Sequence, residues 1–158
     1  MSLTALGQGH EGLSQITRGI AEIRATGAVA AIPGALMMLA FAYARLGQPV
    51  DGLKCLAEIA QIIETTDERQ NESTSHSWRG VLLDATGDPS AAERSHHQAI
   101  AIAKLQSAKL SELRASINLA RLWCKQDRRG EARNLLADLR LVQRHLKEAK
   151  ALINELQD

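Results

Sequence analysis

Hydrophobic residues between positions 32 and 65 recur with the spacing of an α-helix, and the pattern is interrupted once by a short turn. The first half has its apolar residues at i, i+3, i+4 and i+7: Leu36, Leu39, Ala40 and Tyr43. Gly47 can adopt the left-handed conformation that ends a helix, and Pro49 suits the first turn of the next. The second half has three inward-facing residues: Gly52, Leu56 and Ile59. The pattern predicts two helices, over residues 32–46 and 49–65.

The same pattern returns at a step of 40 residues along the chain. The turn position is held by Gly7, Gly47, Gly87 and Asp127. The small residue early in each second helix is Gly12, Gly52, Ala92 or Ala132. The next two inward positions hold Ile16, Leu56, His96 and Leu136, and then Gly19, Ile59, Ala99 and Leu139. The first helices repeat Ala40, Gly80 and Ala120, followed by Tyr43, Leu83 and Trp123. Small residues let neighbouring helices cross closely, so the columns predict a helical repeat protein.

This helix pair resembles the tetratricopeptide repeat (TPR). The positions of the signature W-x2-L-G-x2-Y…A-x3-F are held here by Leu36, Leu39, Ala40, Tyr43, Gly52 and Leu56. The resemblance implies an all-α fold, a TPR-like right-handed superhelix (an α-α solenoid) of about three helix pairs with one extra helix at each end. The 40-residue step exceeds the usual length of about 34 and reaches the HEAT/armadillo range, which is the competing architecture. The short turn and the small contact residues favour the TPR-like array.

The repeat phase also predicts how the chain is divided. We expect a single domain over residues 7–158, in which three repeat copies are followed by a C-terminal capping helix: 28–67, 68–107, 108–144 and 145–157. Residues 1–6 are expected to be an added leader or the end of a missing repeat helix. Residues 8–26 are expected to be a second helix whose partner is absent. This arrangement predicts a fragment of a larger protein, and the alternative is a natural chain whose first helix caps the stack.

Three stretches narrow the resemblance further: residues 92–103, 111–123 and 146–152. Together with the 40-residue step, they resemble the C-terminal TPR-like tail of bacterial signalling proteins in which a class III adenylate/guanylate cyclase domain precedes an AAA ATPase module. The resemblance covers roughly residues 8–157 and implies a regulatory or scaffold role in signal transduction. The sequence departs from it at His96, where a large apolar residue is usual, and in the short segment between Leu139 and Leu146.

Composition narrows the range of partners and locations. The 19 basic and 18 acidic side chains leave a formal charge of +1, so nothing in the charge balance indicates nucleic-acid binding. Hydrophobic content of 45% with only 3% aromatic residues suits close-packed helices rather than a β-sandwich. Cys55 and Cys124 fall inside helical patterns, which favours small apolar roles and a reducing, cytoplasmic location. No apolar run reaches the ~18 residues of a membrane span, and no signal peptide is recognisable.

No catalytic, metal-binding or cofactor site is predicted. The chain has five histidines: His10, His76, His96, His97 and His145. His96 and His97 are neighbours that point about 100° apart on a helix, so they chelate poorly together, and we interpret His96 as a repeat-packing residue. Glu93 and Arg94 are expected on a solvated helix face. The P-loop string is absent. The enzyme alternative is a small stand-alone hydrolase that uses the histidines.

The concave face is the predicted binding site, because the first helices of TPR pairs line it. Counting from the signature positions places nine residues there: Met37, Phe41, Arg45, Ser77, Val81, Asp84, Arg114, Ile117 and Arg121. A groove that mixes Met, Phe and Ile with arginines suits an amphipathic helix or an acidic apolar peptide better than a Lys/Asn carboxylate clamp. The alternative is a groove that faces solvent or is filled by another part of the parent protein.

These observations predict a scaffold or regulatory domain for protein–protein interaction. It would bind a protein or peptide partner, or another part of its own chain, through the concave face. The alternative is a structural spacer or dimerisation tail without a groove function. In that case Leu13, Ile16 and Ile20 would form a self-association patch, and the isolated chain would be a homodimer.

Overall fold

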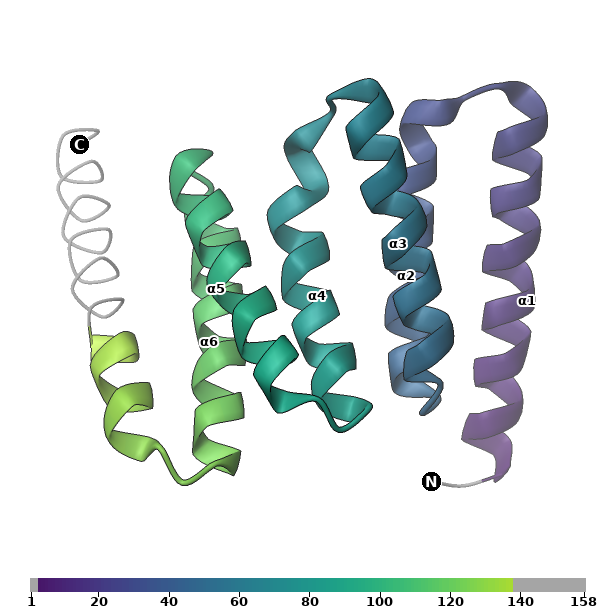
Figure 1. Ribbon diagram of the computed structural model, residues 1–158. Coiled ribbons are helices and arrows are strands. Elements are labelled where there is room, and N and C mark those ends of the chain that lie inside the picture. The colour runs from purple at the N-terminus through teal and green to yellow at the C-terminus, as the bar shows by residue number, and fades with distance from the viewer. Residues whose placement is uncertain (1–2, 138–158) are drawn as a thin grey trace, which may run out of the picture.

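The computed structural model describes residues 3–137, and this part of the chain is built from helices. Six α-helices are α1 (Leu3–Thr26), α2 (Ile32–Arg45), α3 (Pro49–Thr66), α4 (Glu72–Ala85), α5 (Pro89–Leu105) and α6 (Lys109–Lys125). Residues 129–137 are also helical, and short 3-10 turns lie at Val29–Ala31 and Arg69–Asn71. Consecutive helices run antiparallel and pack against each other in chain order (Figure 1). The expected all-helical repeat array is confirmed, and the predicted capping helix over 145–157 lies outside the described residues.

Residues with positive φ recur every 20 positions and end successive helices. They are Gly27, Gly47, Asp67, Gly87, Ser107 and Asp127, with φ between 54° and 87°. The predicted turns at Gly47, Gly87 and Asp127 are therefore confirmed. The other three residues with positive φ lie in the links that separate the repeat units. The predicted turn at Gly7 is wrong, because α1 continues through it. Gly47 and Gly87 are each followed two residues later by a proline that begins the next helix, whereas Gly7 is followed at that position by Gly9.

The turns within the pairs share one hydrogen-bond pattern. The backbone N–H of Gln48 donates to the carbonyl of Tyr43 at 2.9 Å. The equivalent bonds, Asp88 to Leu83 and Arg128 to Trp123, are 3.0 and 2.8 Å long. This is the Schellman arrangement, which satisfies the last carbonyls of a helix when the preceding residue is left-handed. The 40-residue repeat thus sets the backbone geometry of each turn as well as its sequence.

Small residues set the close crossings inside and between pairs. A Cβ added to Gly52 of α3 would lie 2.9 Å from Leu82 Cδ1 of α4 and 3.3 Å from the Ala40 carbonyl oxygen of α2. Ala40 and Ala92, from the same columns, are completely buried. Packing around these contacts forms two hydrophobic clusters, one over α1–α4 and one over α5, α6 and residues 129–137. The columns identified in the sequence are therefore the crossing points of the array.

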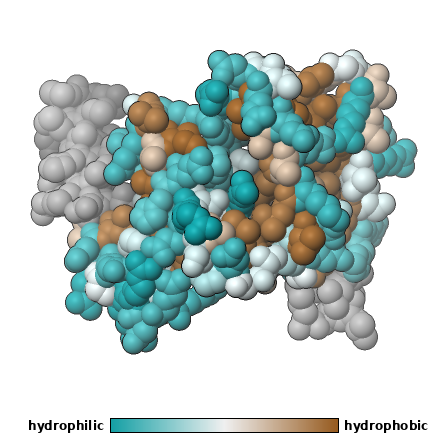
Figure 2. All heavy atoms as spheres, in the orientation of Figure 1, coloured by the Kyte–Doolittle hydropathy of each residue, from teal (hydrophilic) through white to brown (hydrophobic). Residues whose placement is uncertain are grey.

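A polar layer lies between the two clusters. It consists of buried side chains on α4 and α5: Ser73, Ser75, Ser77, Ser95 and His96. Ser73 Oγ donates to the carbonyl of Ala99 at 2.9 Å, and His96 packs directly on Gly80. On the face seen in Figure 2, hydrophobic atoms gather over α1 and α3, whereas α5 is mostly covered by hydrophilic atoms. The face seen in Figure 2 is therefore more apolar near α1 and α3 than over α5.

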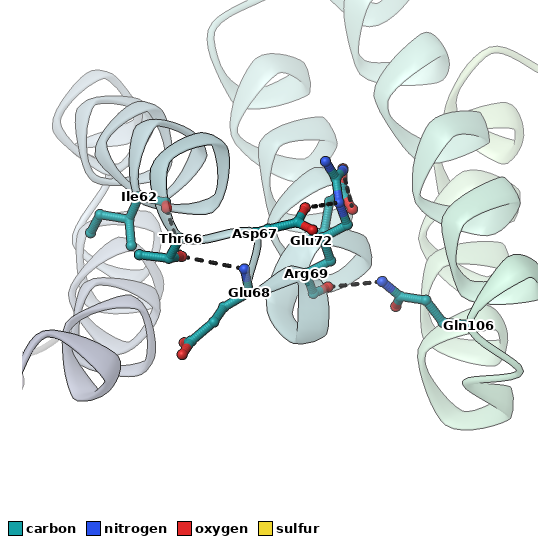
Figure 3. Close-up of polar contacts among 7 residues, drawn as sticks. All are labelled: Ile62, Thr66, Asp67, Glu68, Arg69, Glu72 and Gln106. Atoms are coloured by element: carbon teal, nitrogen blue, oxygen red, sulfur yellow. Dashed lines mark hydrogen bonds and ion pairs between the residues drawn. The ribbon is translucent and has the colours of Figure 1, made fainter.

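The link between α3 and α4 is held by side-chain contacts that the sequence did not predict (Figure 3). Arg69 lies between Asp67 and Glu72, with Nε 2.7 Å from Asp67 Oδ1 and Nη1 3.3 Å from Glu72 Oε1. Gln106, at the end of α5, donates from Nε2 to the Arg69 carbonyl at 2.8 Å. This hydrogen bond joins the beginning and the end of the repeat copy over residues 68–107.

Candidate functional site

Two hollows open along one side of the array, which we call the inner face. The apolar hollow lies among α1, α2 and α4 and has a volume of about 650 Å³. It is lined by Gly9, Gly12, Leu13, Ile16, Gly34, Met37, Met38, Phe41, Ala42, Arg45, Leu46, Asn71 and Trp78. The polar hollow lies between α4 and α6 and has a volume of about 460 Å³. It is lined by Thr74, Ser77, Trp78, Val81, Ser111, Arg114, Ile117, Asn118 and Arg121. Trp78 lines both hollows and joins them.

The apolar hollow exposes large hydrophobic side chains. Met38 is 61% exposed and Phe41 is 45% exposed, and both lie on α2. The Phe41 ring meets the Trp78 ring of α4 edge to face, with centroids 5.2 Å apart. Leu13 and Ile16 of α1 contribute partly buried apolar surface to the opposite wall. Water-exposed Met and Phe within a concavity are typical of surfaces that bind another protein.

The polar hollow combines hydrogen-bonding groups with positive charge. Asn118 Nδ2 donates to Ser77 Oγ at 3.1 Å and ties α6 to α4. Arg114 and Arg121 lie two helical turns apart on α6, and both are exposed. Val81 and Ile117 supply the apolar part of the wall. The hollow therefore offers guanidinium groups above a floor fixed by an inter-helix hydrogen bond.

Among the described residues, no acidic side chain lines either hollow, although three arginines do: Arg45, Arg114 and Arg121. None of the three takes part in an ion pair among the described residues. Arginines elsewhere in the described chain do so, as Arg24 with Glu58 and Arg128 with Glu93. The described residues therefore give each hollow at least one arginine that has no ion-pair partner among them.

The structure brings most of the predicted concave-face residues into these hollows. Eight of the nine line one hollow or the other, and Asp84 lines neither. Asp84 instead pairs with Lys125 of α6, with Oδ2 and Nζ 2.5 Å apart. Ser77 is only 6% exposed, and its hydroxyl accepts a hydrogen bond from Asn118. It therefore forms part of the floor of the polar hollow.

The three residues of the expected self-association patch are divided between the core and the apolar hollow. Ile20 is 4% exposed because it packs in the core of α1–α4. Leu13 and Ile16 are partly buried and line the apolar hollow instead. The apolar stripe of α1 has a partner within the array, because α1 packs on α2.

The nine residues predicted for the concave face leave out several lining residues, among them Met38, Trp78 and Asn118. Met38 and Trp78 each stand one position after a predicted residue, so a slightly wider stripe on each helix would have included them. Asn118 follows Ile117 in the same way. The prediction counted one narrow line per helix, whereas a helix that faces a concavity exposes a broader stripe.

Three titratable residues outside the hollows have a pKa that their surroundings lower: His96, Glu93 and His76. His96 is 1% exposed and unpaired at Nδ1, and desolvation lowers its pKa to about 4. It packs on Gly80 inside its own helix pair, which agrees with the predicted packing role. Glu93 was expected to be solvated, but it accepts from Trp123 Nε1 at 2.8 Å and from Arg128 Nη1 at 2.7 Å. The hydrogen bond from Arg128 is the main reason that the Glu93 pKa is lowered. Burial also lowers the pKa of His76.

The cysteines and the acidic groups do not form a further cluster in the described part of the chain. Cys55 is buried, and desolvation raises its pKa, whereas Cys124 is exposed rather than part of the core. Within residues 3–137, no three His, Cys, Asp or Glu side chains are arranged to hold a metal ion. Over the same residues, no helix combines the length and the apolar character needed to cross a membrane.

Comparison with known proteins bears on the first helix pair. No curated protein matches the chain. The tetratricopeptide repeat family model matches residues 33–58, which cover nearly all of α2, the Gly47 turn and the first half of α3. That segment contains Met37, Met38 and Phe41 of the apolar hollow. The chain therefore contains a segment similar to a tetratricopeptide repeat unit, inside an array of helix pairs.

Proposed function

We propose that this chain is a protein-recognition module that binds a segment of another protein, or of its own parent chain, along the inner face. The observation that supports this most strongly is the exposure of Met38 and Phe41 in a concavity of about 650 Å³. An exposed apolar surface costs free energy in water, at about 25 cal/mol per Å². A partner that covers the surface recovers that free energy, which favours binding.

The rigid frame of the hollows also supports a binding role. Leu46, at the end of α2, fills the space beside Gly9 of α1, where an added Cβ would lie 2.6 Å from Leu46 Cδ2. On the other side, the Asn118–Ser77 hydrogen bond fixes α6 against α4. A surface held open by its supporting helices loses little conformational entropy on binding. Tetratricopeptide repeats are associated with protein partners in general, which agrees with this role.

The wider setting that we propose comes from the sequence alone. It is the C-terminal tail of a bacterial signalling protein with cyclase and ATPase modules, working in the cytoplasm without catalysis of its own. The support is the 40-residue step and the resemblance of residues 92–103 and 111–123 to such tails. The coding sequence upstream of residue 4 tests this setting: an ATPase module there supports it, and an unrelated coding sequence contradicts it.

Site-specific photocrosslinking tests the binding role. A photoreactive amino acid replaces Met38 on the inner face or, as a control, Arg94 on the exposed side of α5. In extracts of the cells that make the protein, we expect a discrete crosslinked product from position 38 and none from position 94. A Phe41→Ala substitution should abolish that product. Equal labelling at both positions, or none at position 38, would contradict recognition through the inner face and favour the spacer or dimerisation alternative.

A further inference from the structure

We infer that the inner face selects one chemical class of partner: an amphipathic helical segment whose apolar side chains enter the apolar hollow and whose carboxylates lie over the polar hollow. This inference rests on the proposed function and adds the chemistry and the spatial order of the partner. It follows from three properties of the described residues. The apolar and the charged lining residues are separated into two hollows, no described acidic residue lines either hollow, and the spacing of the helices sets the distance between the hollows.

The two hollows differ in chemistry, although they adjoin at Trp78. The apolar hollow is lined mainly by aliphatic, methionine and aromatic side chains and by glycines, with Asn71 and one arginine, Arg45 at the end of α2, as its polar members. The polar hollow has two arginines, two serines, a threonine and an asparagine among its nine lining residues. A partner of uniform polarity would leave one hollow mismatched. A segment with apolar groups on one side of Trp78 and polar groups on the other matches both.

The sign of the partner's charge follows from the lining. Arg114 and Arg121 are exposed, and within residues 3–137 no Asp or Glu lines either hollow. Asp84, the nearest acid predicted for this face, is paired with Lys125. A carboxylate on the partner would therefore gain a guanidinium neighbour without displacing an internal ion pair. A lysine or arginine at that place would be repelled, which gives the surface discrimination as well as attraction.

The spacing of the helices sets the spacing within the partner. Packed helices lie about 8–10 Å apart, so the apolar hollow and the polar hollow are separated by roughly that distance across α4. A helical segment rises about 1.5 Å per residue, so it covers this separation in about six or seven residues. The partner should therefore carry its apolar cluster and its carboxylates on one face, about two helical turns apart.

Selection from a random peptide library displayed on phage tests the inference and does not require an identified partner. A library of 16-residue peptides is panned against the immobilised chain. The affinity of the enriched peptides is then measured by fluorescence anisotropy. We expect enrichment of apolar residues together with two or more Asp or Glu, offset by about seven positions. Binding should weaken as salt is added, because exposed ion pairs are screened.

Two matched variants separate charge at the site from charge in general. Arg114→Glu/Arg121→Glu reverses the polar hollow, and Arg94→Glu/Arg133→Glu makes the same change at exposed arginines that line neither hollow. Circular dichroism confirms that both remain helical. We expect a loss of affinity of about tenfold or more for the first variant and less than about twofold for the second.

The outcomes distinguish this inference from the proposed function. Enriched peptides that lose binding with Phe41→Ala but are neutral or basic would overturn the acidic partner and leave inner-face recognition standing. Acidic peptides that bind both double variants equally would overturn the role of Arg114 and Arg121. Peptides indifferent to Phe41→Ala as well, or a failure of any peptide to enrich, would overturn both proposals.

Discussion

Replacing Gly80 by alanine should destabilise the array, although alanine is the better helix former. Gly80 lies inside α4, and its space is filled by the His96 ring of α5. An added Cβ would lie 2.5 Å from His96 Cε1 and 2.7 Å from both ring nitrogens. His96 is 1% exposed, so its ring has little room to retreat. The clash therefore has to be relieved by shifting α4 and α5 apart.

The magnitude can be worked from two opposing terms. Gly→Ala within a helix gains about 0.5–1 kcal/mol, because glycine loses more conformational freedom on folding. Overpacking a filled core costs about 1–3 kcal/mol. The free energy of unfolding should therefore fall by about 1 kcal/mol. Gly19→Ala in α1 is the matched control, since an added Cβ there meets no atom within 4 Å, and it should stabilise by about 0.5–1 kcal/mol.

Urea denaturation followed by circular dichroism at 222 nm measures both variants. The difference between the two substitutions isolates the overlap with His96 and should be about 1–3 kcal/mol. The double substitution Gly80→Ala/His96→Leu copies the Ala40 and Leu56 pair of the preceding repeat and should recover the lost stability. Equal effects of Gly80→Ala and Gly19→Ala would refute the close contact between α4 and α5.

Three further outcomes follow from the contacts described. Between pH 6.5 and 4 the unfolded chain binds a proton at His96 that the folded chain excludes. Over this range the free energy of unfolding should therefore fall by roughly 3 kcal/mol more in the unsubstituted chain than in His96→Leu. Urea denaturation at each pH measures the difference. Glu93→Ala leaves the Trp123 indole unpaired and should cost about 1–2 kcal/mol in the same assay, whereas Arg94→Ala should cost less than about 0.5 kcal/mol. Phe41→Ala, at a half-exposed site, should lower peptide affinity in anisotropy at least fivefold while secondary structure by circular dichroism stays unchanged.

The repeat could be predicted from the sequence because each column corresponds to a physical necessity. Gly47, Gly87 and Asp127 occupy a left-handed conformation that few residues adopt, and Ala40 and Ala92 stand where helices touch. Few residue types fit such positions, so the 40-residue step is recognisable in the sequence. Gly7 shows the limit of the method, because glycine is also compatible with a helix interior and only its neighbours decide between the two.

The candidate site was harder to predict, because side-chain partners lie far apart in sequence. The stripe on the first helices could be counted, so Phe41, Arg114 and Arg121 were found. The ion pair between Asp84 and Lys125 spans 41 positions, and the Glu93 contact with Arg128 spans 35. No local sequence pattern predicts such pairs. They decide which charged side chains are paired, and for that reason they had to come from the structure.

The array contains two tryptophans, and this pair provides the most direct test of the inner face. Trp78 lines both hollows, whereas the Trp123 indole donates to Glu93 outside them. The measurement is a titration of the nitrogen-15-labelled chain with a selected acidic amphipathic peptide, observed at the two indole N–H signals. We expect the Trp78 signal to shift saturably while the Trp123 signal stays in place. Binding that moves Trp123 and leaves Trp78 unchanged would contradict recognition through the inner face.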